Sequence, residues 1–111
     1  MGTFFLVVSI IAFLISFGIT KLPAYDDIVG NPLSMILPFV GGFILAVVAE
    51  CILIDLAWYW VFLINSAAAW TIGILLGAIY ARWFNPNPAF GDVIITFGVG
   101  VVALILGAIM I

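Results

Sequence analysis

Residues 33–84 read LSMILPFVGGFILAVVAECILIDLAWYWVFLINSAAAWTIGILLGAIYARWF, and only Glu50, Asp55 and Arg82 among them carry a formal charge. As one helix this stretch would be roughly 78 Å long, more than twice the hydrocarbon thickness of a bilayer. It must therefore fold back on itself. The position of the turn determines whether Glu50 lies within the membrane.

The composition places the whole chain among the membrane proteins. Of its 111 residues, 68% are hydrophobic and 6% are charged, whereas soluble domains carry about a quarter charged residues. A chain with so little polar surface needs lipid as its solvent, and one domain is sufficient at this length. We therefore predict an all-α integral membrane protein with a single transmembrane domain over residues 1–111.

The same composition argues against several classes of function. Two basic residues and a net charge of −3 leave no basic patch for nucleic acid. Without histidine, and with Cys51 as the single cysteine, the chain offers no ordinary ligand set for zinc, haem or iron–sulfur clusters. Its hydroxyl side chains have no histidine base. We therefore expect no catalytic, metal or cofactor-binding residues and no enzymatic activity, and we expect bound lipids instead of a cofactor.

Two turn-forming stretches, at residues 21–32 and 85–92, interrupt the apolar sequence. Both are rich in proline, glycine and asparagine, which break helices and favour turns. The sequence therefore predicts four transmembrane helices in a compact up-down bundle with short loops, at about residues 3–20, 33–54, 58–84 and 93–111.

The turn between the second and third helices has two candidate positions. The first is Asp55 to Ala57, with Asp55 capping the third helix. This position puts tryptophans at both ends of the third helix, Trp58 and Trp60 at one and Trp83 at the other, as in the aromatic belts of membrane proteins. The alternative turn is at Asn65-Ser66. We favour the first because it uses both aromatic belts.

Small residues recur at three- and four-residue spacing along each predicted helix, which lets helices approach closely in a membrane. On the first helix they are accompanied by Ser9 and Ser16, and we expect that face to pack against protein while the Phe/Leu/Ile face meets lipid. The predicted packing residues of the other helices are Gly42, Ala46, Ala69, Gly73, Gly77, Gly100 and Gly107.

Glu50 is the strongest candidate for a functional residue. It ends a small-residue stripe on the second helix, and with the turn at Asp55 it lies at a depth comparable to that of Asn65. We predict a hydrogen bond between Glu50 and Asn65. Glu50 then acts either as a membrane carboxylate that exchanges protons or binds a cation, or as a structural residue that joins helices or faces a partner subunit.

The two basic residues, Lys21 and Arg82, fall on the first and third loops. In a four-helix topology these loops share one side, and the positive-inside rule places that side in the cytoplasm and both termini outside. The leading functional hypothesis is an accessory or structural subunit of a larger membrane complex, such as an energy-converting or oxidoreductase assembly. Its partners would be other membrane subunits within the lipid bilayer.

Two alternatives remain open. One is a small homo-oligomeric transporter or channel coupled to protons or cations through Glu50. The other is a structural membrane protein of a virus or envelope.

Overall fold

The computed structural model describes residues 1–22, 33–84 and 90–111, so most of both predicted turn-forming stretches lies outside the described residues. The described part is all-helical and contains no strand. Four helical stretches in it are long and apolar enough to cross a membrane: Gly2–Thr20, Ile36–Leu53, Trp58–Trp83 and Gly91–Met110. The chain is therefore compatible with a multi-pass membrane protein.

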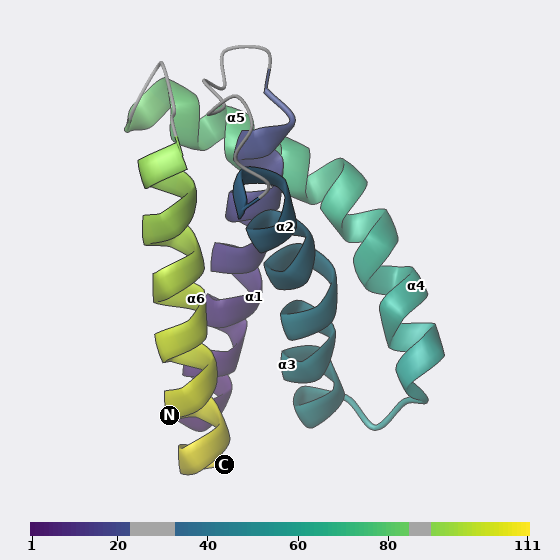
Figure 1. Ribbon diagram of the computed structural model, residues 1–111. Coiled ribbons are helices and arrows are strands. Elements are labelled where there is room, and N and C mark those ends of the chain that lie inside the picture. Colours follow the sequence, from purple (N-terminus) through teal and green to yellow (C-terminus); the bar gives the residue numbers. More distant parts are fainter. Residues whose placement is uncertain (23–32, 85–89) are drawn as a thin grey trace.

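Helix α1 (Gly2–Thr20) is the centre of the bundle, and the other three stretches pack around it (Figure 1). Ten of its 19 residues are buried, against five of the 26 residues of the third stretch. Ser9 and Ser16 are buried as expected, but so are Phe13 and Phe17. The expectation that the Phe/Leu/Ile face of α1 meets lipid is therefore wrong for Phe13 and Phe17, because α1 has protein neighbours on several sides, although Phe4 and Ile11 are exposed.

The second stretch consists of α2 (Leu33–Phe39), the π-helical segment η1 (Val40–Leu45) and α3 (Ala46–Leu53). Pro38 cannot donate a backbone hydrogen bond, and Gly41 and Gly42 follow it three and four residues later. Proline, paired small residues and π turns are the usual causes of irregular helices. Their coincidence explains why the regular α-helical ladder is interrupted here.

The chain reverses between Leu53 and Trp58, and Asn65 and Ser66 lie inside helix α4 (Trp58–Ala68). The alternative turn at Asn65-Ser66 is therefore wrong. The expected cap is wrong as well: Ala57 is the N-cap residue of α4, and no side-chain hydrogen bond caps this helix. Asp55 lies two residues too early for that position and is exposed.

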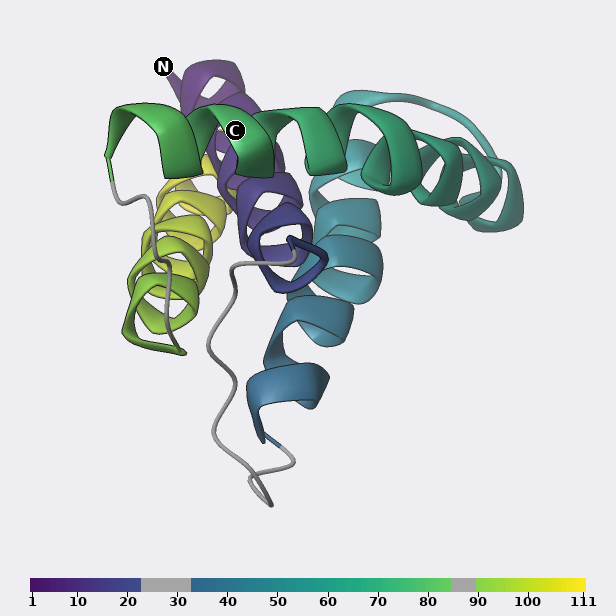
Figure 2. The ribbon, with the colours of Figure 1, turned by 90° about the horizontal axis from the view of Figure 1, so that it is seen from above.

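The third stretch bends at the π-helical segment η2 (Ala69–Gly73). Helix α4 runs from the turn after α3 along the side of the bundle, whereas α5 (Ile74–Trp83) lies across the end of α1 (Figures 1 and 2). The hydroxyl of Thr71 donates a 2.7 Å hydrogen bond to the carbonyl of Ala67, and such bonds within a helix favour bending. The third stretch is thus oblique to its neighbours instead of parallel to them.

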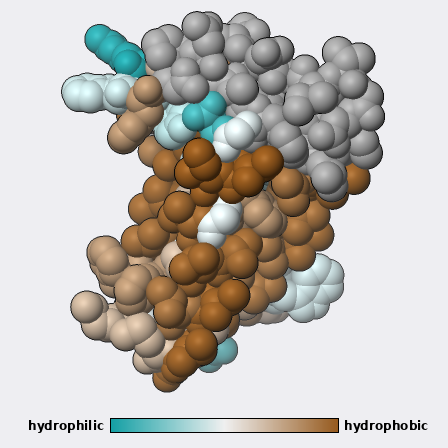
Figure 3. Space-filling model, turned by 60° about the vertical axis from the view of Figure 1, so that its left-hand side comes forward, coloured by the Kyte–Doolittle hydropathy of each residue, from teal (hydrophilic) through white to brown (hydrophobic). Residues whose placement is uncertain are grey.

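Helix α6 (Phe90–Met110) returns along α1, so both termini lie at the same end of the bundle (Figure 1). The end of α1, the end of α5 and the start of α6 lie together at the opposite end. In Figure 3 the surface below the grey atoms is mainly hydrophobic, and hydrophilic side chains gather at the upper left. Large apolar side chains exposed on all four stretches suit contact with lipid tails.

Candidate functional site

Asn65 on α4 is fully buried, and its Nδ2 donates a 2.5 Å hydrogen bond to the carbonyl oxygen of Gly42. The π turn makes this oxygen available: the N–H of Ala46, which an α-helix would direct to Gly42, is directed to Gly41 and Phe43. The predicted Glu50–Asn65 hydrogen bond is therefore wrong. Because α4 is oblique, Asn65 meets the second stretch two turns away from Glu50.

Glu50 lies in the last turn of α3 and is half-buried. Its Oε2 atom is buried and has no hydrogen-bond partner among the described residues. The Oδ1 atom of Asn65 is likewise buried and has no hydrogen-bond partner among the described residues. In hydrocarbon an unpaired polar group is costly, so both atoms mark places where the isolated chain leaves hydrogen bonding incomplete.

The small-residue face of the third stretch packs against α1 with almost no space between the two backbones. A Cβ built on Gly77 would lie 2.5 Å from the carbonyl carbon of Gly18, and one built on Gly73 would lie 3.1 Å from the carbonyl oxygen of Leu14. A Cβ on Gly18 would overlap the carbonyl of Gly73. Gly73 and Gly77 therefore form the contact that holds this stretch across α1.

The other glycines named from the sequence accept large side chains of α1. A Cβ on Gly42 would lie 2.8 Å from the Cβ of Phe17, and one on Gly100 would lie 2.6 Å from the ring of Phe13. Gly107 meets Leu6 in the same way. The stripes thus serve packing within this chain, and α1 supplies the facing side chains. All the named packing residues are buried: Gly42, Ala46, Ala69, Gly73, Gly77, Gly100 and Gly107.

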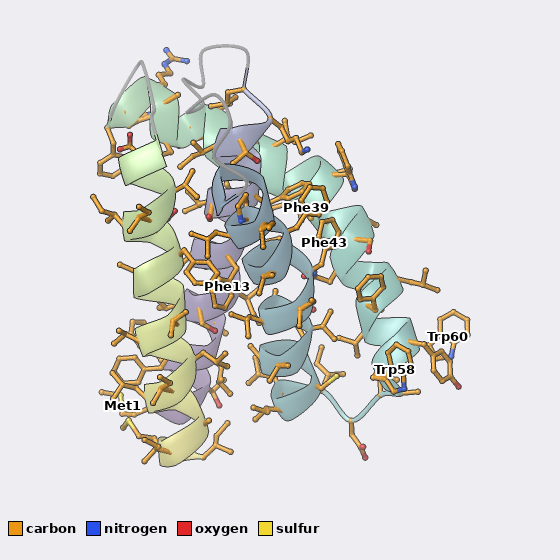
Figure 4. The ribbon with its side chains drawn as sticks, in the orientation of Figure 1. Met1, Phe13, Phe39, Phe43, Trp58 and Trp60 are labelled. Atoms are coloured by element: carbon orange, nitrogen blue, oxygen red, sulfur yellow. The ribbon has the colours of Figure 1, made fainter. Side chains whose placement is uncertain are left out.

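An aromatic cluster surrounds Phe17 at the C-terminal end of α1. The Phe17 ring lies edge-on to Phe39, Phe43 and Trp70, with centroid distances of 5.9, 5.0 and 5.2 Å. Phe39 and Phe43 extend from the second stretch toward the third (Figure 4). The Lys21 ammonium lies 5.3, 5.0 and 5.2 Å from the ring centroids of Phe17, Phe39 and Trp70.

Sequence reasoning missed this arrangement of one ammonium and three rings. The spacing of Phe17 and Lys21 could have suggested one contact, because residues four apart share a helix face. No local signal brings Trp70 there, since its position depends on the bend at η2. Sequence reasoning also missed the hydrogen bond in which the Tyr80 hydroxyl donates to Oδ1 of Asp92, at 2.6 Å, which joins α5 to α6.

Neither a metal-binding cluster in the described residues nor a similar known protein adds a functional residue to this site. Within residues 1–22, 33–84 and 90–111, no three His, Cys, Asp or Glu side chains lie close enough together to hold a metal ion. No protein-family model, curated protein or solved structure matches the chain.

Proposed function

We propose that this protein is a small multi-pass accessory subunit of a larger membrane complex, and that the side formed by α3 and α4 receives a helix of another subunit. The observation that carries the proposal is the sparse packing of α4. Val61 and Asn65 are its only buried residues. Beyond its own helical stretch, its packing within the described part is chiefly with α3 and η1.

Exposure alone is a weak argument in a membrane, because lipid tails cover apolar side chains as well as protein does. The unpartnered Oε2 of Glu50, on the neighbouring α3, adds a polar reason for a partner. Glu50 as a whole is half-buried, and a hydrogen-bond donor from another subunit would complete the hydrogen bonding of its carboxyl group. Charged groups inside membranes usually pair with other polar groups or face the interior of an assembly.

The test is mild-detergent purification of the native protein, followed by native mass spectrometry. The proposal expects recovery with larger membrane subunits at a fixed stoichiometry. Photo-crosslinking then locates the contact: a crosslinker at Leu63 on α4 should capture another subunit, and one at Ile105 on α6 should not. The two side chains are matched, with 59% and 53% of their surfaces exposed. Recovery of the chain alone would contradict the proposal.

A homo-oligomeric transporter coupled to protons or cations is the second candidate, and the buried Oε2 of Glu50 is the observation in its favour. Recovery as a defined homo-oligomer would support it. The decisive measurement is then ion flux in liposomes: coupling through the carboxylate requires that Glu50→Gln abolish flux while the oligomer remains intact.

A further inference from the structure

The three rings around Lys21 come from three different parts of the chain and form a box. Phe17 belongs to α1, Phe39 to α2 and Trp70 to η2. The planes of Phe39 and Trp70 stand at 80° and 83° to the plane of Phe17, so Phe17 is the base and the other two are walls. The ammonium is within 5.3 Å of every centroid, which is inside the range for cation–π attraction.

Within the part of the chain that the structure describes, the three rings are the contacts of the Lys21 ammonium. Within the described residues its ammonium takes part in no ion pair. Phe39 and Trp70 have 43% and 52% of their surfaces exposed, so the box is open to the outside. Aromatic boxes of this kind recognise quaternary and methylated ammonium groups.

We propose that Phe17, Phe39 and Trp70 form a binding site for a trimethylammonium group, such as choline or a choline headgroup, and that Lys21 occupies this site as a tethered competitor. The backbone here is fixed by hydrogen bonds from the Lys21 N–H to the carbonyl of Gly18 and from the Leu22 N–H to the carbonyl of Ile19. Its side chain is a flexible four-carbon stem with a compact ammonium. The lysine can therefore leave the rings without any change in the helices.

The tether determines how tightly an external cation binds. A group held on a short flexible linker competes at an effective concentration in the millimolar range. A trimethylammonium ligand is more weakly hydrated than the lysine ammonium and fills the same box. Removal of the Lys21 charge should therefore make external binding tighter, whereas a different cation at the same position should preserve the competition.

The experiment is an NMR titration of the four tryptophan indole N–H resonances of the whole protein in dodecyl maltoside. The Trp70 resonance is assigned by its loss in Trp70→Phe. Choline should shift this resonance in a saturable way, and Lys21→Gln should lower the half-saturating concentration by roughly tenfold. Lys21→Arg is the matched control, because arginine also binds aromatic faces, and it should titrate like the unmodified protein.

The neutral isostere 3,3-dimethyl-1-butanol separates charge recognition from simple apolar contact. It should leave the Trp70 resonance in place over the same concentration range. Phe39→Leu in the Lys21→Gln background should weaken choline binding by about fivefold, because one wall is lost. Equal shifts with choline and the isostere would overturn the proposal, as would identical choline titrations of Lys21→Gln and the unmodified protein.

Nanodiscs of phosphatidylcholine and phosphatidylglycerol then identify the source of the ammonium group for Lys21→Gln. If a lipid headgroup enters the site, the Trp70 resonance in phosphatidylcholine discs starts at its choline-saturated position and added choline has no effect. If only free cations enter, choline titrates the protein equally in both lipids. Either result supports a trimethylammonium site. The proposal would be overturned if, in both kinds of disc, the Trp70 resonance did not start at its choline-saturated position and did not move when choline was added.

Discussion

Asn65 donates its side-chain hydrogen bond to the carbonyl oxygen of Gly42, which lies in a π turn of the preceding helical stretch. In a regular α-helix the Gly42 carbonyl would instead accept the backbone N–H of Ala46. The π turn directs the N–H of Ala46 away from Gly42, and the oblique course of α4 brings Asn65 to that level. The bond therefore joins two irregularities of the fold.

Replacing Asn65 with leucine should lower the free energy of unfolding by about 1 kcal/mol, because the Gly42 carbonyl loses a buried partner. The measurement is unfolding of the purified protein in mixed micelles, followed by circular dichroism. Ser66→Ala is the matched control, since among the described residues the Ser66 hydroxyl bonds only to the Phe62 carbonyl of its own helix. If both variants unfold alike, the Asn65 bond has no stabilising role.

Gly77→Ala should destabilise the protein by about 1–3 kcal/mol, because the added methyl must push α5 away from the backbone of Gly18. Gly98→Ala provides the comparison. Apart from the backbone of its own helix and its chain neighbours, no atom of the described residues lies within 4 Å of a Cβ placed on Gly98. Alanine is also a better helix former than glycine by about 1 kcal/mol. Gly98→Ala should therefore be neutral or stabilising. Equal destabilisation in the two variants would contradict the close contact of α5 and α1.

The four apolar stretches were predictable because hydropathy and turn residues are local properties of the sequence. Four helices long enough to cross a membrane are present, and the described part is all-helical. The bend at η2 was not predictable from these signals. It depends on the Thr71 hydroxyl and on close packing of Gly73 against α1, and a pattern of hydropathy registers neither effect.

The candidate site was predictable only in part, for the same reason. Asn65 is buried and hydrogen-bonded, but its partner is Gly42 and not Glu50. Small residues at regular spacing marked Gly73 and Gly77, but spacing does not name the facing helix. The Lys21 cluster required the position of Trp70, which follows from the bend. Sequence patterns thus gave the faces of single helices, whereas contacts between helices required the three-dimensional arrangement.

Tyr80→Phe should lower the free energy of unfolding by about 1 kcal/mol, because it removes the hydroxyl that donates to Asp92. That bond links α5 to the first turn of α6. The control is Tyr59→Phe, because the Tyr59 hydroxyl makes no hydrogen bond within the described residues and the side chain is 52% exposed. Thermal unfolding in detergent measures both. An unchanged midpoint for Tyr80→Phe would show that α5 and α6 do not depend on this bond.

Glu50 separates the two candidate functions, because each needs a different property of its carboxyl group. A structural contact with another subunit needs hydrogen-bonding capacity, which Glu50→Gln retains and Glu50→Leu removes. Recovery of partner subunits by native mass spectrometry should therefore be preserved in Glu50→Gln and reduced by tenfold or more in Glu50→Leu. Coupled transport needs the ionisable group itself, so it predicts loss of ion flux in Glu50→Gln. If Glu50→Leu retained its partners fully, the carboxyl group would have no role in assembly, and the subunit interface would have to rest on the apolar side chains of α4 alone.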